Sequence, residues 1–200
     1  MDVADALAGR RSCRNFSAEP VPPAVLDGVL AAALRAPSAG NTSALDLVVL
    51  EGPDQTGRYW DVTLPDGPRR DRFAWPGLLV APVLVIPTVR PRSYVERYAE
   101  PDKAGAGLGR DTAAWTVPYW FVDGGAAVMA MLLAATGAGL GSLLFGQFAH
   151  GPAVASAFGI PADRAALGTV ALGRPAPDRP GRSAARGRQA LEEMVHRSRW

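Results

Sequence analysis

Cysteine, histidine and lysine are scarce in this chain, and each shortage excludes a kind of site. The single cysteine, Cys13, has no partner for an intramolecular disulfide and no companions for a thiolate metal cluster. The two histidines, His150 and His196, lie 46 positions apart and match no zinc-ligand spacing. We therefore expect a reduced, cytoplasmic protein that holds no metal.

An excess of charge of one sign is lacking too. The 21 Lys and Arg face 19 Asp and Glu, and a net charge of +2 is too small to indicate a nucleic-acid-binding protein. Lys103 is the only lysine, so the basic residues are almost all arginines, which bind phosphate and carboxylate through two N–H groups at once. A hydrophobic content of 48% over 200 residues is enough for the core of one domain, residues 1–200.

Neither a signal peptide nor a membrane span is expected. The first twelve residues, MDVADALAGRRS, contain acids and no apolar run. No residue between Asp123 and His150 is charged, and that stretch is long enough to cross a bilayer. Glycines interrupt it, so we expect a buried central helix followed by a glycine-rich loop. These glycines are Gly124, Gly125, Gly137, Gly139, Gly141 and Gly146.

Helical periods alternate with short apolar runs along the chain, which indicates an α+β or α/β fold. Predicted helices cover residues 2–9, 23–36, 118–136 and 151–158, and a terminal helix begins over 189–195. Predicted strands cover residues 45–51, 78–89 and 167–173, with a strand or short helix within 137–148. Residues 52–77 read as loops and a short helix. Pro82 and Pro87 should lie at strand ends or at a sheet edge.

The stretch Arg10-Arg11-Ser12-Cys13-Arg14 is the most distinctive group of charges. Three guanidinium groups and a hydroxyl can surround a phosphate, although a solvated basic face is the favoured interpretation of the stretch taken alone. The arginines would lower the pKa of Cys13, but a small buried residue is the expected role of that cysteine. Residues 174–200 form an arginine-rich extension that is either solvated or attracts anions.

Three further segments could approach a ligand. Small residues in 36–43 and 137–146 allow a planar ligand to lie close to the backbone. Neither segment carries a GxGxxG or Walker motif, which argues against a Rossmann nucleotide site. Residues 90–121 form a long, charged and aromatic segment, typical of an insertion or a lid.

The order of these pieces resembles the nitroreductase family of FMN-dependent oxidoreductases. The resemblance rests on RRSCRNF, ALRAPSAGNTS, LVVLEG, GLGSLLFG, GIPADRAALGTVALGRP and ARGRQALEEMVHRSRW, in that order over nearly the whole chain. It implies a three-layer α+β fold whose central sheet is mixed, mainly antiparallel and flanked by helices. It also implies an intertwined homodimer with two FMN sites at the subunit interface.

The resemblance implies which residues bind the FMN phosphate. Arg10 and Ser12 match phosphate-binding positions, and Arg11 lies beside them. A second arginine comes from the extension, where Gly187 leaves Arg186 and Arg188 both open and Arg188 is preferred.

The flavin ring is expected to meet three groups of residues. Arg14 matches a basic residue near the pyrimidine edge, where a cation helps to set the redox potential. The loop that the partner subunit lays against the ring matches Pro37, Ser38 and Asn41. The other side of the ring, with a backbone N–H that can donate to flavin N5, matches Ser142, Leu143 and Gly146.

The substrate side departs from the family pattern. Asn41 is usually followed by Gln-Pro-Trp, but here it is followed by Thr42-Ser43-Ala44-Leu45, so the substrate preference of relatives does not transfer. Substrate contacts are expected from segment 90–121, with packing against the dimer partner as the alternative for each aromatic residue. The candidates are Tyr94, Tyr98, Trp115 and Trp120.

The implied reaction is a ping-pong hydride transfer from NADH or NADPH, through flavin N5, to a small planar or conjugated organic substrate. Two alternatives stay open. One is a flavin-dependent dehydrogenase or oxidase of a peptide-like or biosynthetic intermediate, with oxygen as acceptor. The other is a non-catalytic flavin-binding protein. The expected partners are a second copy of the chain and the small-molecule substrate, with no nucleic acid and no membrane.

Overall fold

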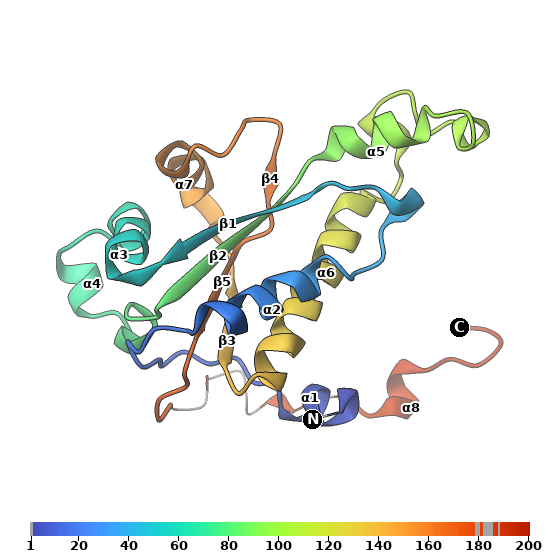
Figure 1. Cartoon of the computed structure of the whole chain (residues 1–200). Coiled ribbons are helices and arrows are strands. Elements are labelled where there is room, and N and C mark those ends of the chain that lie inside the picture. Colours follow the sequence, from blue (N-terminus) through green and yellow to red (C-terminus); the bar gives the residue numbers. More distant parts are fainter. Residues whose placement is uncertain (1, 179–180, 182–185, 188) are drawn as a thin grey trace.

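The computed structural model describes residues 2–178, 181, 186–187 and 189–200, and a five-stranded sheet forms its centre (Figure 1). The order is β1-β2-β5-β3, with the short β4 also paired to β2, and all these pairings are antiparallel. The strands are β1 (Leu45–Glu51), β2 (Val83–Val89), β3 (Gly141–Phe145), β4 (Ala165–Ala166) and β5 (Thr169–Gly173). The expected mainly antiparallel sheet is therefore confirmed.

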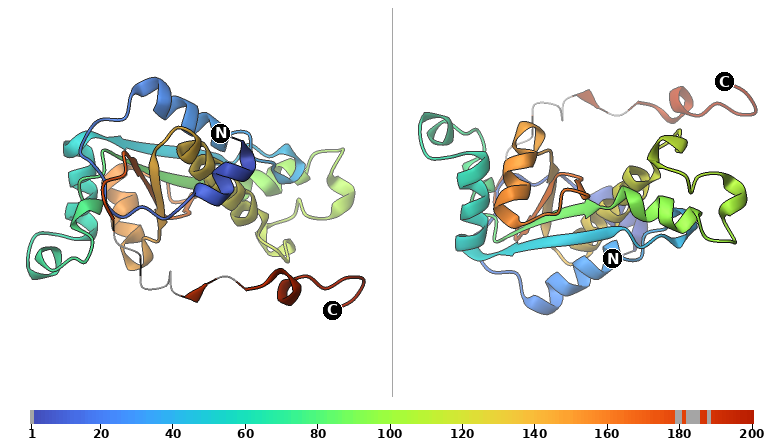
Figure 2. Two further views of the ribbon diagram at one scale, coloured as in Figure 1. Left: turned by 90° about the horizontal axis from the view of Figure 1, so that it is seen from below. Right: turned by 90° about the horizontal axis from the view of Figure 1, so that it is seen from above.

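Helices cover both faces of the sheet, which gives three layers (Figures 1 and 2). One face is covered by α2 (Pro23–Ala33) and α6 (Tyr119–Gly137), and the other by α3 (Gly52–Thr63) and α7 (Gly151–Phe158). The remaining helices are α1 (Val3–Gly9), α4 (Pro68–Asp71), α5 (Pro91–Tyr98) and α8 (Leu191–Met194). The predicted α+β class is confirmed.

Strand β2 shows why the sheet lies at the centre of the core. All seven of its residues are buried, as an unbroken apolar run predicts for a strand covered on both faces. Val83 and Val85 pack against α2 and α6, whereas Leu84 and Ile86 pack against α3 and α7. The alternation follows directly from the two-residue period of a strand.

The predicted position of Pro87 is wrong, because this proline lies inside the central strand β2. The pairing explains how it is accommodated. Val85 pairs with Val170, but Thr88 pairs with Ala166, so the chain between β4 and β5 carries one extra residue opposite Pro87. Proline has no backbone N–H, and the bulge at Leu167 and Gly168 interrupts the ladder at the point where that N–H would have been needed. β2 itself begins at Val83, later than residue 78, since Pro76–Leu78 forms a 3₁₀ turn.

The prediction of mainly loops in residues 52–77 is also wrong. Helix α3 has 12 residues and begins with a Gly-Pro pair, where proline is well tolerated. Only Thr56, Tyr59 and Trp60 are buried, so polar residues on the outer face conceal its period in the sequence. At the other end of the chain, α8 is shorter than the predicted 189–195 helix.

Helix α6 is the predicted apolar central helix. It packs against α2, β2 and β3, and its buried residues include Met131 and Ala135. By length and composition it is the one described helix that could also cross a membrane. Of its most apolar 18-residue stretch, 39% is buried inside the structure. Its first turn exposes large apolar side chains, namely Tyr119, Phe121 and Val122.

Candidate functional site

The basic stretch lies along the open edge of the sheet. Ser12 forms a parallel bridge with Ser142 of β3, and the Cys13 N–H donates to the Ser142 carbonyl oxygen over 3.0 Å. β3 is the last strand in the order, so its outer edge has no other strand beside it. The structure thus brings together the two segments that the sequence had assigned to phosphate and to ring, from far apart in the chain.

Beyond this bridge the edge of β3 opens toward a ligand-sized space. After Cys13 the basic stretch turns away, and the Phe16 N–H donates to Gly77 instead. Successive residues of a strand turn their N–H groups to alternate edges, and Ser142 faces the outer one. Leu144, and by continuation Gly146, therefore turn theirs to the same outer edge.

A hollow of about 380 Å³ adjoins this edge. Its lining includes Arg14, whose guanidinium lies over the Trp75 ring at 5.4 Å from the ring centroid. Most other lining side chains are apolar or aromatic, from α3, residues 73–78 and residues 143–148. The hollow therefore joins a positive charge at one end to an apolar wall, which suits an anionic planar ligand.

Two buried polar groups near this edge lack a partner. The Ser142 hydroxyl and the Trp60 indole N–H are both buried and make no hydrogen bond with the described residues. Ser142 belongs to the edge strand, and Trp60 lines the hollow. Because unpaired buried polar groups are rare in native proteins, the Trp60 N–H marks a point on the wall of the hollow where a polar ligand atom can bind.

The other residues of the basic stretch differ in their surroundings. Arg10 is half-buried and follows α1, whereas Ser12 is exposed. Arg11 donates to the Ala8 and Arg10 carbonyl oxygens, so its charge stabilises the carboxyl end of α1. Burial raises the pKa of the Cys13 thiol, and this outweighs the nearby arginine. The expected lowering of that pKa is wrong, and Cys13 is the expected small buried residue.

The start of the extension returns to the basic stretch. The Arg14 N–H donates to the Asp178 carboxylate over 2.7 Å, and the Asn15 amide donates to the Pro177 carbonyl over 2.6 Å. Helix α8 lies apart from the sheet and the helices that cover it (Figures 1 and 2). Arg186 is exposed, with no bond to Arg10 or Ser12 within the described part of the chain. Arg188 lies outside the described residues.

The second small-residue loop, around Ala39–Asn41, is held by α5 and α6. The Asp123 carboxylate of α6 accepts from the Ala39 N–H and from the Tyr94 hydroxyl, each at 2.8 Å. Arg97 of α5 donates to the Gly40 carbonyl over 2.8 Å. Gly40 has φ +65°, and Asn41 has φ +55°, so the loop turns through a left-handed conformation.

This loop borders a separate hollow of about 330 Å³. Its lining includes Pro37, Ser38 and Asn41, of which Pro37 and Asn41 are exposed. Within the part of the chain that the structure describes, no residue lines both this hollow and the one beside β3. The loop joins the first turn of α6, whereas the basic stretch follows Gly9, which lies beside Thr136 in the last turn. One chain therefore keeps this loop and the start of the basic stretch about 20 Å apart along α6.

The four substrate candidates form an aromatic cluster under this loop. Tyr94, Trp115 and Trp120 are buried, and the Tyr98 ring lies 4.7 Å from that of Trp115. Tyr98 also packs against Gly40. Burial raises the pKa of the Tyr94 hydroxyl, and its hydrogen bond to Asp123 raises it further. This burial favours the packing alternative, and contact of these residues with substrate stays a prediction.

Sequence reasoning missed three residues beside the edge of β3. Gln147 is buried, and its amide donates to the Thr169 hydroxyl over 3.0 Å. The Thr169 hydroxyl also bonds the Tyr59 hydroxyl over 2.8 Å. The sequence feature that could have indicated this network is Gln147, an amide side chain in the otherwise apolar run Leu143–Ala149.

The fold and the site define an α+β protein with a basic segment on an open sheet edge, beside an apolar hollow. The nitroreductase family model matches residues 7–174, and the chain belongs to the nitroreductase family. The match ends at Arg174, so the arginine-rich extension lies outside it. Among the described residues, no three His, Cys, Asp or Glu side chains lie close enough together to hold a metal ion.

Solved structures share this fold at low sequence identity. A nitroreductase family protein from Streptococcus pneumoniae has a TM-score of 0.75 at 16% identity, covering 98% of this chain and 100% of that one. A protein named as a nitroreductase from Desulfovibrio desulfuricans, solved in complex with FMN, has a TM-score of 0.69 at 22% identity, covering 100% and 98%. One from Clostridium acetobutylicum, named as an NADH oxidase, has 0.65 at 18%, covering 100% of both chains.

Proposed function

We propose that this chain is an FMN-dependent oxidoreductase, which takes a hydride from NADH or NADPH and passes it to a small planar or conjugated organic substrate. The observation that carries the proposal is the bridge between Ser12 and Ser142. It sets the arginine-rich stretch beside the open edge of β3 and the 380 Å³ hollow. Family membership and the FMN bound to the Desulfovibrio relative support the same cofactor.

The residues at this edge fit the parts of FMN. Arg10 and Ser12 supply a guanidinium and a hydroxyl for the phosphate, and Arg188 is the proposed second arginine. The apolar hollow suits the ring, with Arg14 as a positive charge at one end. The Trp60 indole N–H, which belongs to the lining of the hollow and has no partner among the described residues, would donate to a polar atom of the ligand.

Bound FMN would supply the hydride chemistry, which no side chain can provide alone. The protein residues would bind, orient and shield. Arg14 beside the pyrimidine end would favour a negative charge there and so raise the reduction potential. The N–H groups on the outer edge of β3 would orient the ring, and the apolar wall would exclude water.

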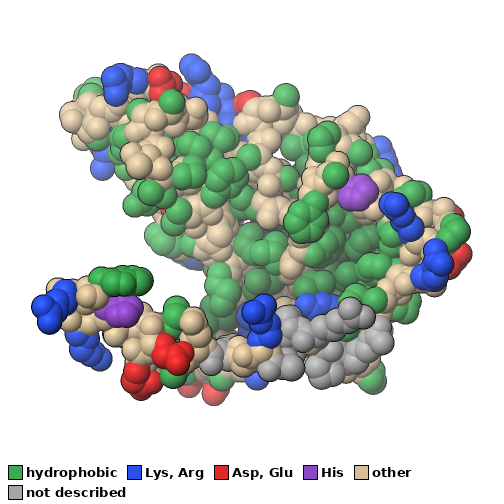
Figure 3. All heavy atoms as spheres, turned by 180° about the vertical axis from the view of Figure 1, so that it is seen from behind, with side chains coloured by type: hydrophobic (Ala, Val, Ile, Leu, Met, Phe, Trp, Pro, Cys, Tyr) green, Lys and Arg blue, Asp and Glu red, His purple; other side chains and the backbone are tan. Residues whose placement is uncertain are grey.

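We further propose that the active form is a homodimer. The loop Pro37–Asn41 and the edge of β3 border separate hollows in one chain, so a second copy is needed to bring them to one ring. Exposed apolar side chains are available for an interface, including Leu34 and those of the first turn of α6. Figure 3 shows hydrophobic side chains gathered in a recess on one face, beside which the extension projects.

The test is a titration of the purified full chain with FMN, followed by anaerobic mixing with NADH and then NADPH. Bleaching of bound flavin by either donor is the expected result. Flavin that binds but stays oxidised with both donors would replace the reductase by the dehydrogenase or oxidase alternative. Failure to bind FMN would overturn the proposal. Light scattering with and without FMN tests the dimer, and a monomer in both states would contradict it.

Substitutions distinguish arginines that bind the phosphate from a general effect of removing a positive charge. Arg10→Ala and Arg188→Ala should each weaken FMN binding by more than about tenfold, because a charged hydrogen bond to phosphate is lost. Arg69→Ala removes an exposed arginine of α4 and should leave binding unchanged. Full FMN occupancy in both test variants would show that these arginines do not bind the phosphate.

A further inference from the structure

Three uncharged polar side chains meet inside the protein directly behind the candidate flavin edge. Tyr59 comes from α3, Thr169 begins β5, and Gln147 follows β3 by two residues. Their exposed fractions are 1%, 0% and 7%. The Thr169 hydroxyl links the other two side chains, at 2.8 Å from the Tyr59 hydroxyl and 3.0 Å from the Gln147 amide nitrogen.

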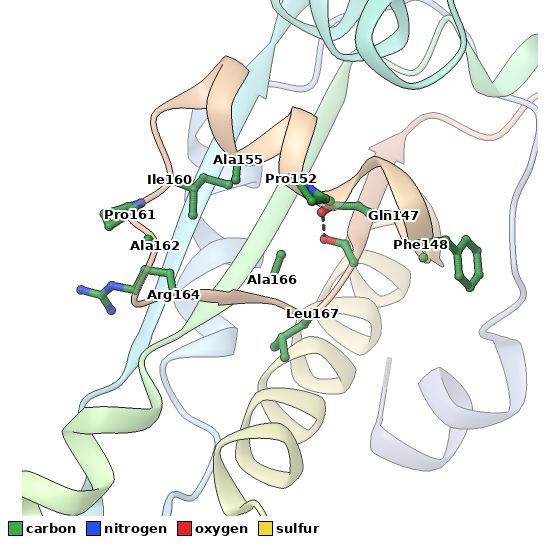
Figure 4. A pocket seen from close by; sticks show the side chains of 13 residues that line it. Gln147, Phe148, Pro152, Ala155, Ile160, Pro161, Ala162, Arg164, Ala166 and Leu167 are labelled. Atoms are coloured by element: carbon green, nitrogen blue, oxygen red, sulfur yellow. Dashed lines mark hydrogen bonds between the residues drawn. The ribbon is translucent and has the colours of Figure 1, made fainter. Parts of the chain in front are cut away.

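Gln147 sits at the centre of a short turn, Gly146–Phe148, that divides two hollows. The turn lines both the 380 Å³ hollow beside β3 and a second hollow of about 450 Å³ under α7. Figure 4 shows the Gln147 side chain turned inward, toward Gly168, while the Phe148 ring points away from the second hollow. The turn therefore separates the two hollows, with the Gln147 side chain buried in the core and the Phe148 side chain exposed.

The backbone of this turn is in an unusual conformation. Phe148 has φ +46°, which is rare for a residue with a large side chain, and its ring is 90% exposed. The ring lies against Gly146, where a Cβ atom would come within 2.8 Å of it. Such a conformation persists only where the surroundings fix it.

The buried hydrogen bonds of Gln147 are the feature that fixes it. An apolar side chain of similar size would fill the same space without desolvating an amide, so a buried polar network is better explained by the geometry it imposes. The backbone carbonyl of Gln147 also accepts from the His150 N–H over 2.9 Å, which closes the turn on its other side. The backbone at Gly146 is thereby held at the outer edge of β3.

We propose that Gln147, through Thr169 and Tyr59, is a positioning residue that holds the Gly146 backbone and the Phe148 ring against the bound flavin. The proposal rests on the FMN function above, and it adds that buried hydrogen bonds to Gln147 fix the turn in place. Gln147 touches no ring atom in this proposal. It acts through the peptide of its neighbour and through the wall that Phe148 supplies.

The test compares Thr169→Val with Thr88→Val. Both remove the hydroxyl of a buried threonine, but Thr88 lies on β2 and bonds only the Asp46 carbonyl, at 3.4 Å. Each variant is titrated with FMN by fluorescence, and the visible circular dichroism of the bound flavin is recorded. Thr169→Val should raise the FMN dissociation constant about tenfold and change the dichroism, whereas Thr88→Val should do neither.

Three further variants keep the test decisive if Thr169→Val folds poorly. Tyr59→Phe removes one outer hydroxyl of the network at constant ring size and should cause a smaller change in the same direction. Thr169→Ser retains the hydroxyl and should restore the wild-type dichroism. Gln147→Leu should match Thr169→Val in its effect on FMN.

The outcomes separate this inference from the proposed function. If wild-type protein binds no FMN, the function itself is wrong. If it binds FMN and Thr169→Val, Gln147→Leu and Thr88→Val all keep the wild-type affinity and dichroism, the function stands and the positioning role is wrong. The same holds if Thr88→Val disturbs the flavin as much as Thr169→Val.

Discussion

The two segments proposed to meet the flavin are held in opposite ways. The loop around Ala39–Asn41 is held by charged groups near the surface, from Asp123 and from Arg97, which in turn pairs with Asp102 at 2.7 Å. The turn Gly146–Phe148 is held from within by uncharged and buried groups. In the first segment the Arg97–Asp102 pair is exposed to water and salt, whereas the network of the second segment is buried.

This difference indicates which substitutions and solution conditions should destabilise each segment. Exposed ion pairs contribute little free energy, are screened by salt and depend on pH. A buried network is insensitive to salt but costly to leave half satisfied. We therefore expect changes of volume or backbone to damage the turn, and loss of the bonds from Asp123 and Arg97 to loosen the loop.

Gly168→Ala should cause the largest loss of stability and should act on the turn side. Gly168 has φ +115°, and a Cβ atom there would lie 2.6 Å from the Phe145 carbonyl oxygen. Strain and a clash with rigid backbone together should cost about 3 kcal/mol or more, a fall of about 6–12 °C in Tm. Calorimetry measures this, and a Tm unchanged within about 2 °C would show that the bulge relaxes freely.

Asp123→Ala should cause the next largest effect and should act on the loop side. It leaves the buried Tyr94 hydroxyl and the Ala39 N–H without their shared acceptor, at a cost of about 2 kcal/mol. Asp123→Asn is the matched control, because its carbonyl oxygen can still accept both bonds. Chemical denaturation of both variants measures the difference. Equal losses would show that the charge of Asp123, not its accepting oxygen, holds the loop.

The fold was predictable where one local pattern dominates. Helix α6 carries a long, mostly apolar run, and β1 is a short apolar run that follows a loop of small residues, so both elements were expected in place. Helix α3 was missed because Gly52, Pro53 and Gly57 suggest turns, while its packing onto β1 and β2 supplies the stability that its composition lacks.

The candidate site was predictable only as separate segments. The arginines and the small-residue loops stand out in the sequence, and the bridge between Ser12 and Ser142 joins two of them. The anchors do not stand out: Tyr59 and Thr169 lie 110 residues apart, and their contact follows from how α3 crosses β5. Pairings of this kind depend on the packed fold, not on any local preference.

Gly40→Ala tests how tightly α5 packs on the loop, compared with Gly159→Ala. Both glycines have φ +65°, so both variants carry the same backbone strain of about 1 kcal/mol. A Cβ atom at Gly40 would also lie 2.9 Å from the Tyr98 ring, whereas at Gly159 it would meet nothing within 4 Å. Gly40→Ala should therefore lower Tm by about 2–4 °C more than Gly159→Ala. Equal shifts would show that Tyr98 moves aside easily.

The smallest effect should be the pH and salt dependence of the Arg97 clamp. The hydrogen bond from Arg97 lowers the pKa of the exposed Asp102 carboxyl, so the folded protein favours its ionised form. The stability from this pair is present above the ordinary carboxyl pKa and is lost as the pH falls through the lowered one. Hydrogen exchange at the Asn41 and Thr42 amides, which bond back within the loop, measures the opening.

Exchange at these two amides should quicken between about pH 5 and pH 3, beyond its intrinsic pH dependence, and also in about 1 M salt. Arg97→Ala should show the faster exchange already at pH 7 and should lose most of the added response to acid and salt. The His150 amide, which bonds the Gln147 backbone carbonyl of the turn, serves as the internal reference and should not respond to salt. A salt response of equal size in both segments would contradict the distinction between a charged clamp at the surface and an uncharged one inside.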